Sequence, residues 1–179
     1  MNDKFNELAK LGAGEFEHLN GSLIQHLCGT RDLLKSWSAS EVLQDAGLYH
    51  AVYGTAGFDE KLVSLTQRER ISKIIGDDAE KLVYEYCACD REFFWPKIGV
   101  ENGLVFKNRF TGETYQLDQK LLNSFCELTV ANELEIAKDN PGFIQQYGAS
   151  LHQVFLNMEN YLSSPANNMV TKMLGACHA

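Results

Sequence analysis

Two histidines and one aspartate, His26, His50 and Asp90, carry the chemistry that this sequence suggests. Each falls at a core-facing position of a different expected helix, where a polar side chain costs free energy unless it has a partner. Neutral imidazoles bind Zn, Fe and Ni well, and a carboxylate adds negative charge next to the cation. Two histidines and one carboxylate also leave coordination positions open for water, substrate or dioxygen. The sequence therefore predicts that these three residues hold one divalent metal ion (Fe, Mn, Zn or Ni).

Three expected helices must position these residues. The first runs from about residue 22 to 37, with apolar side chains at helical spacing around His26. A capping box at Ser38-x-x-Glu41 is expected to start the second helix, which ends at His50. A third helix is expected to start at Asp77 and to end before Pro96, with Asp90 on its apolar stripe.

A loop rich in small residues follows the second helix. Tyr53, Gly54 and Thr55 come directly after His50, and Gly57 adds a second glycine within four residues. Glycine lets a backbone approach a ligand closely. We expect Tyr53, Gly54 and Thr55 to line the pocket beside the metal.

The remaining patterns predict a mainly α fold with one small hairpin. A short helix is expected near the N-terminus, and a capping box at Thr66-x-x-Glu69 starts a helix that Gly76 ends. Alternating apolar and turn residues over 103–117 indicate a β-hairpin. Further helices are expected over 118–138, from Asn140-Pro141 to about residue 162, and after Ser164-Pro165. We expect one compact helical domain over 1–179.

The order His26, then Ala46-Gly47-Leu48-Tyr49-His50, then Asp90 resembles the HD superfamily of metal-dependent phosphohydrolases. The stretch from Arg70 to Val83 is similar to a helix pair of the guanosine tetraphosphate hydrolases, and the loop after His50 is similar to that of an uncharacterised HD-like group. The resemblance covers about residues 18 to 95. It implies an HD-like helical bundle, with His26, His50 and Asp90 as three of the family's four metal ligands.

The sequence departs from that family at the dyad. Ala51 stands where the family has its metal-binding aspartate, and Gly54 and Thr55 stand where the alarmone hydrolases have an acidic pair. Three functions follow as alternatives. The first is a metal-dependent hydrolase of a small phosphorylated or otherwise anionic molecule. The second is a non-haem iron oxygenase, since the HD fold also serves iron oxygenases. The third is a non-catalytic binding or regulatory module.

Other polar residues have roles in these alternatives. Glu133 lies on an apolar stripe and His18 shortly precedes the first expected helix, so we expect them to handle protons, with His18 also a candidate for the missing ligand. The alternatives are an ion pair between Glu133 and an arginine, and a surface position for His18. Arg31, Arg70 and Arg91 are candidate contacts to an anionic substrate, or are solvated.

Composition limits the partners and the compartment. A net charge of −8 argues against general nucleic-acid binding, which needs clustered Lys and Arg. Five cysteines, an odd number, do not indicate a disulfide framework, and Cys87-x-Cys89 is better explained by small core residues than by a metal site. No apolar run approaches the ~20 residues of a membrane helix. We therefore expect a cytoplasmic protein that binds a small anionic molecule, with no nucleic acid or membrane partner, and a homo-oligomer remains open.

Overall fold

The chain is built mainly from helices, which confirms the predicted fold class. The structure is a computed structural model, and it describes residues 2–13, 17–18, 21–100 and 103–177. Backbone contacts divide the chain into two compact units, Met1–Ala88 and Cys89–Ala179. A single domain over 1–179 stays a prediction.

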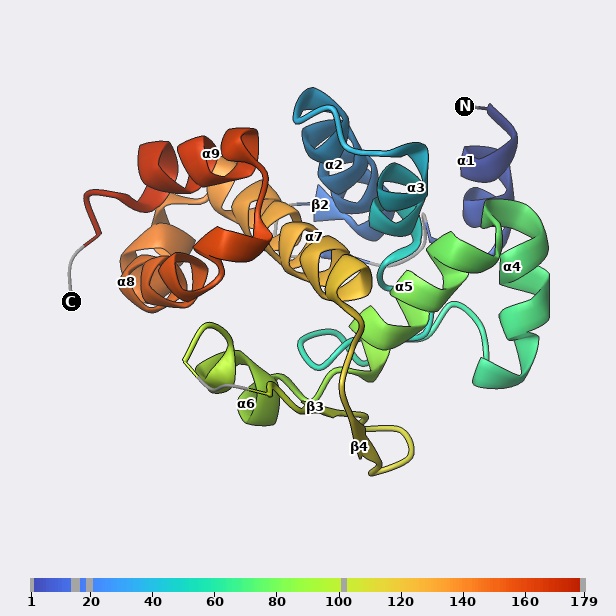
Figure 1. Cartoon of the computed structure of the whole chain (residues 1–179). Helices are drawn as coiled ribbons and strands as arrows, with labels where there is room; N and C mark the ends of the chain where they lie inside the picture. Colours follow the sequence, from blue (N-terminus) through green and yellow to red (C-terminus); the bar gives the residue numbers. More distant parts are fainter. Residues whose placement is uncertain (1, 14–16, 19–20, 101–102, 178–179) are drawn as a thin grey trace. The chain divides into compact units, whose positions relative to one another are not determined.

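The first unit consists of helices with one short antiparallel ladder near its start. In chain order it holds α1 (Asn2–Lys10), β1 (Glu17–His18), β2 (Gly21–Ser22), α2 (Leu23–Ser36), α3 (Glu41–Tyr49), η1 (Leu65–Gln67), α4 (Arg68–Ile75) and α5 (Asp77–Ala88). Helix α2 packs against α3, and α3 packs against α5, while α1 lies alongside α4 (Figure 1). The β1–β2 ladder was not expected from the sequence.

Helix starts in the first unit follow capping chemistry, at positions that differ from two of the predictions. The N-cap of α3 is Ser40, whose hydroxyl accepts a hydrogen bond from Leu43 N, so the box predicted at Ser38 is wrong. Ser38 has a φ of 60°, and an N-cap residue needs extended backbone. The box predicted at Thr66 is also wrong, because Ser64 and Gln67 form it at η1 instead.

Side chains from α1 to α5 fill the core of the first unit. Gly76 ends α4 as predicted, with a φ of 87° that favours glycine. Each of these helices buries aliphatic side chains. They include Leu23, Leu27 and Leu34 of α2, Ala46 and Leu48 of α3, Ile71 of α4, and Leu82 and Val83 of α5.

Backbone hydrogen bonds hold the connection between α3 and η1 at two places, its base and its tip. At its base, the carbonyl of Val52 accepts from Leu62 N at 3.0 Å and from Val63 N at 3.2 Å. Near its tip, Thr55 and Phe58 exchange backbone hydrogen bonds of 2.7 and 3.2 Å around two exposed residues. The segment is therefore an ordered turn whose start is buried.

The second unit holds a hairpin and a group of longer helices. In chain order it contains α6 (Arg91–Phe94), η2 (Trp95–Lys97), β3 (Phe106–Lys107), β4 (Thr114–Tyr115), α7 (Gln119–Lys138), α8 (Pro141–Asn157), η3 (Glu159–Tyr161) and α9 (Ser164–Leu174). The hairpin expected in 103–117 is confirmed, with Phe106 opposite Tyr115. Helix α7 packs against α8 and α9 (Figure 1).

Sequence signals place most helix ends of the second unit correctly. Asp118 caps α7, and Asn140 caps α8 with Pro141 at its start, as predicted. Helix α8 ends at Asn157 rather than near residue 162, and Ser163, not Ser164, caps α9. Phe94, Phe106 and Phe125 form an aromatic cluster with ring centroids 5.1 to 6.0 Å apart. This cluster joins the hairpin to α6 and α7.

Across the residues that the structure describes, no helix is both long and apolar enough to cross a membrane.

Candidate functional site

Two of the predicted metal ligands, His26 and His50, meet in the core of the first unit. His26 lies in the second turn of α2 and His50 is the C-cap of α3, and their exposed fractions are 4% and 2%. The two rings contact edge to face, with centroids 5.1 Å apart and an interplanar angle of 84°. The structure therefore brings these two side chains together from neighbouring helices.

Hydrogen bonds from the backbone fix the orientation of His50. Its Nδ1 lies 2.8 Å from the carbonyl oxygen of Gly47, which can only accept, so Nδ1 carries the proton of the neutral ring. Nε2 is then the ring nitrogen with a basic lone pair. The carbonyl of His50 in turn accepts from the thiol of Cys87 at 3.1 Å, and the ring of Tyr86 lies 5.5 Å away, edge to face. Helix α5 thus supports His50 from the other side.

Close approach of α2 and α3 makes this contact feasible. Gly47 faces α2, where an added Cβ would lie 2.6 Å from Leu34 Cδ1 and 3.5 Å from Arg31 Cα. A side chain at position 47 would therefore force the buried Leu34 side chain to shift. Gly47 therefore contributes both the carbonyl that binds His50 and the room for α2.

The loop residues Tyr53, Gly54 and Thr55, predicted to line a pocket, are all buried. The hydroxyl of Tyr53 donates to Glu80 at 2.8 Å, and Gly54 has a φ of 75°. Burial, and then the hydrogen bond to Glu80, raise the pKa of Tyr53 far above its usual range. These contacts fix the loop, and a role in substrate binding stays a prediction.

Glu80 is a buried charge that the sequence analysis did not single out. Its carboxylate accepts from Arg68 Nε at 2.7 Å and from Arg68 Nη2 at 2.8 Å, a bidentate pair. The guanidinium also stacks on the ring of Tyr84, 3.7 Å from its centroid. The sequence signal was Glu80 in the first turn of α5 on the face that carries Val83, where burial requires a partner.

Asp90 does not lie on the stripe of one long helix, so that part of the prediction is wrong. Helix α5 ends at Ala88, and Asp90 is the N-cap of α6, with Oδ1 accepting from Phe93 N at 3.1 Å. Its Oδ2 forms an ion pair of 2.9 Å with Lys107 on β3. The hydrogen bond from Lys107 lowers the pKa of Asp90; burial opposes this shift, and the Phe93 amide adds to it. Asp90 belongs to the second unit, and a role as metal ligand stays a prediction.

Glu133 forms the ion pair that was its alternative interpretation. Its Oε1 accepts from Arg91 Nη1 at 3.1 Å and from Asn132 Nδ2 at 2.9 Å. Arg91 also lies over the ring of Trp95, 4.9 Å from the centroid. This confirms the pairing of Glu133 with an arginine and engages Arg91 in the same contact, while proton transfer by Glu133 stays a prediction.

The other candidates differ in their surroundings. His18 lies in β1, but its side chain is outside the part of the chain that the structure describes, so its predicted role is untested. Arg31 is half-buried on α2, and Arg70 is exposed on α4 beside a surface hollow. Across the described ranges, no three His, Cys, Asp or Glu side chains are grouped as a metal site would require. The described donor pair is thus His26 and His50.

Comparisons with known proteins add one match. Residues 7–91 match the family model described as "Domain of unknown function (DUF6817)". That range spans most of the first unit and reaches Asp90 and Arg91, but it does not include Glu133. No curated protein and no solved structure matches the chain. The histidine pair therefore lies within the matched range.

Proposed function

We propose that the first unit binds one divalent metal ion through His26 and His50, and that this ion serves the hydrolysis of a small phosphorylated or otherwise anionic molecule. The contact between two buried imidazoles, with centroids 5.1 Å apart, carries the proposal. Metal-binding histidines commonly donate a hydrogen bond from their other ring N–H to a carbonyl oxygen, and His50 makes that contact to Gly47 through Nδ1. The resemblance to the HD superfamily supports the same pair.

The donor set fits a metal ion in part. Two neutral imidazoles suit Zn, Ni and Fe, and both rings are buried, with the buried ring of Tyr86 next to that of His50. Further coordination positions remain for water or substrate, as in catalytic metal sites. His18 stays a candidate for one more ligand.

A bound divalent ion supplies a nucleophile at neutral pH by lowering the pKa of a coordinated water. The residues of this chain would hold the ion and keep the ring of His50 in one tautomer. Gly47 does this through its carbonyl, and Cys87 restrains the backbone of His50.

A non-catalytic binding or regulatory module is the second candidate, and a specific observation favours it. The carboxylates of Asp90 and Glu133, expected to bind metal and to move protons, are engaged by Lys107 and Arg91. Ala51 adds no donor at the position of the family's aspartate. In this case His26 and His50 serve only as core residues.

Elemental analysis of the full chain, purified without chelator and without added metal, separates the candidates. We expect about one metal ion per chain in the wild type and its loss in His26→Gln and His50→Gln. The control is His152→Gln, which changes a half-buried histidine of α8 in the second unit. Circular dichroism of each variant shows whether it is folded.

The identity of the metal distinguishes the chemistry. Zn, Mn or Ni supports hydrolysis, whereas Fe together with oxygen consumption supports the iron oxygenase. If the protein contains no metal after incubation with each of these ions, and a chelator leaves its melting temperature unchanged, the metal proposal is wrong and the non-catalytic module remains.

A further inference from the structure

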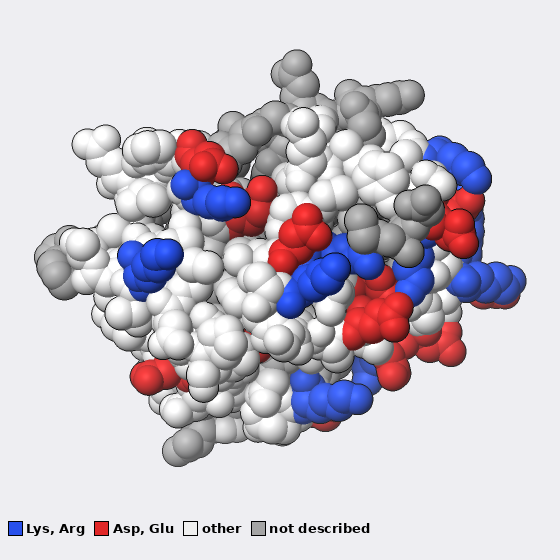
Figure 2. All heavy atoms as spheres, turned by 90° about the horizontal axis from the view of Figure 1, so that it is seen from above, with Lys and Arg blue, Asp and Glu red and all other residues white. Residues whose placement is uncertain are grey.

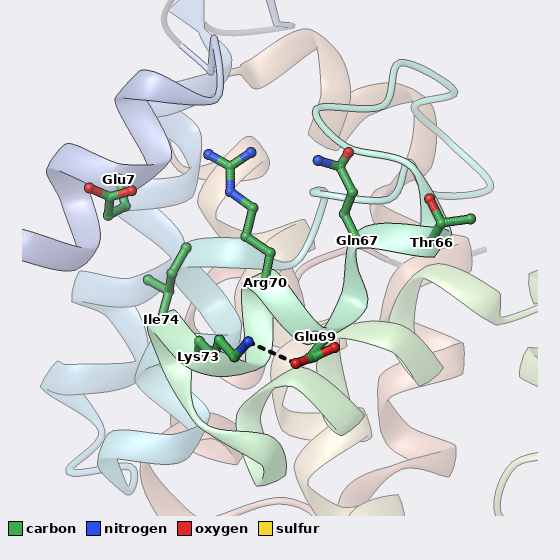
Figure 3. A pocket seen from close by; sticks show the side chains of 7 residues that line it. All are labelled: Glu7, Thr66, Gln67, Glu69, Arg70, Lys73 and Ile74. Atoms are coloured by element: carbon green, nitrogen blue, oxygen red, sulfur yellow. Dashed lines mark hydrogen bonds and ion pairs between the residues drawn. The ribbon is translucent and has the colours of Figure 1, made fainter.

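A surface hollow of about 480 Å³ lies between α1 and α4 of the first unit, with Gln67, Arg70 and Lys73 among its lining residues (Figure 3). We propose that this hollow binds a small molecule through a phosphate or carboxylate group, with Arg70 as the main contact.

Arg70 is a surface cation of this hollow that forms no ion pair with the described residues. Among the described residues, its guanidinium makes no hydrogen bond or ion pair, whereas Arg68 binds Glu80 and Arg91 binds Glu133. Arg70 is exposed, and Figure 3 shows its side chain extending from α4 into the same space as that of Gln67. An exposed guanidinium without an ion-pair partner can bind a carboxylate or a phosphate through two parallel hydrogen bonds.

Gln67 adds a donor that is held in place. Its Oε1 accepts from Ser64 N at 3.2 Å, which fixes the amide as part of a capping box. The amide nitrogen then lies on the side of Arg70, as drawn in Figure 3. A ligand oxygen between the two side chains would receive hydrogen bonds from both.

The acidic side chains of the hollow are already engaged. Glu69 pairs with Lys73 at 2.7 Å, and Glu7 pairs with Lys10 at 2.7 Å. The hydrogen bond from Lys10 lowers the pKa of Glu7, and the charge of Arg70 contributes less. Arg70 therefore keeps a positive charge that these pairs do not neutralise.

A second hollow, of about 430 Å³, is also lined by Gln67, and Lys61 lines it as well. Lys61 is exposed, and its stem lies against Gly54, where an added Cβ would be 3.3 Å from Cγ. Gln67 thus lines both hollows, the first together with Arg70 and Lys73 and the second together with Lys61. A molecule with two anionic groups fits this arrangement better than a monovalent ion.

Basic and acidic side chains are mixed on one face of the molecule. On the face seen in Figure 2, most blue side chains lie next to red ones, and large areas carry no charge. The chain as a whole has a net charge of −8, so non-specific attraction of anions is weak. Binding at Arg70 would therefore depend on local geometry, and it does not rest on the proposed metal site.

Two-dimensional NMR of the full chain, titrated with pyrophosphate and separately with citrate at constant ionic strength, tests the proposal. We expect shifts centred on residues 64–73, and the probe with the lower Kd identifies the preferred anion. Arg70→Gln should weaken binding roughly tenfold, the loss of one charge-assisted contact. Arg70→Lys should weaken it less, and Arg109→Gln, which removes the same charge from the second unit, should leave Kd unchanged.

The proposal is wrong if Arg70→Gln binds either probe as tightly as the wild type. It is also wrong if shifts are spread over all basic residues, or if neither probe binds at millimolar concentration. Metal content should be the same in Arg70→Gln as in the wild type, so failure here and failure of the metal site are distinguishable.

Discussion

A Cβ atom on Gly47 would lie 2.6 Å from Cδ1 of Leu34, so α2 and α3 approach each other at a point where only glycine fits. Leu34 is fully buried and cannot turn outward without opening the core. The contact between His26 and His50 is made by the same two helices. The histidine pair thus depends on a residue without a side chain.

Gly47→Ala should destabilise the protein by about 1–3 kcal/mol, because a methyl group forced into a packed core displaces its neighbours. Urea unfolding monitored by circular dichroism measures the change. The matched control is Gly142→Ala in α8, where the nearest atom to an added Cβ is Asn140 Oδ1 at 3.5 Å. That variant should be neutral or slightly more stable. Equal stability of Gly47→Ala and the wild type would contradict the close approach.

Glu80→Gln should destabilise the protein by about 1.5–3 kcal/mol, because it leaves the partly buried Arg68 without its charged partner. Glutamine keeps the shape and an acceptor for Tyr53. The control is Glu69→Gln, which breaks the exposed pair with Lys73 and should change stability by less than about 0.5 kcal/mol. Urea unfolding curves of the two variants give the two changes in stability. If both variants lose the same amount of stability, burial of the Glu80–Arg68 pair does not strengthen it, and the prediction is wrong.

The sequence predicted the elements well where a local signal decides the structure. Apolar spacing found α2, α7 and the hairpin, and Asp118 and Asn140 marked helix starts, because caps and turns are fixed by neighbouring residues. The cap of α3 was misplaced because Ser38 and Ser40 offer the same hydroxyl, and only the backbone conformation distinguishes them.

The candidate site was predictable only in part. His26 and His50 follow from helical periodicity, since both fall on core faces of consecutive helices. Asp90 was misassigned because apolar residues on both sides of it continue the helical spacing across a break at Cys89–Asp90. The partners Lys107 and Arg91, which engage Asp90 and Glu133, are set by tertiary contacts that no local pattern encodes.

Asp90→Asn should lower stability by about 0.5–1 kcal/mol at neutral pH, because it removes the pair with Lys107 while asparagine still caps α6. The pKa of Asp90 is lowered in the folded protein, so the unfolded chain binds the proton more readily. The stabilisation is therefore complete above the ordinary carboxyl pKa of about 3.9 and is lost as the pH falls through the lower folded-state value.

Unfolding measured at a series of pH values tests this sign. The difference between Asp90→Asn and the wild type should shrink below about pH 3.9. Glu92→Gln, at an exposed neighbouring position, should show no such convergence. A difference that grows on acidification would contradict the assignment.

Thiol labelling should separate the five cysteines by burial. Cys87, Cys89 and Cys126 are buried, and burial raises the pKa of the Cys126 thiol far above its usual range. Only Cys28 and Cys177 should therefore react in the native protein. Cys28 should react slowly, because burial and then Asp32 raise its pKa. Mass spectrometry after brief alkylation, with and without denaturant, counts the modified sites; rapid labelling of Cys126 without denaturant would contradict the packing of α7.

The turn between Thr55 and Phe58 offers a site for inserting foreign sequence. Ala56 and Gly57 are exposed, and the hydrogen bonds that close the turn lie on the flanking residues. A peptide epitope placed between Ala56 and Gly57 would lengthen a loop whose closure cost grows by only about 0.6 kcal/mol for each doubling of its length. An antibody against that epitope would then recognise the native chain without disturbing the histidines.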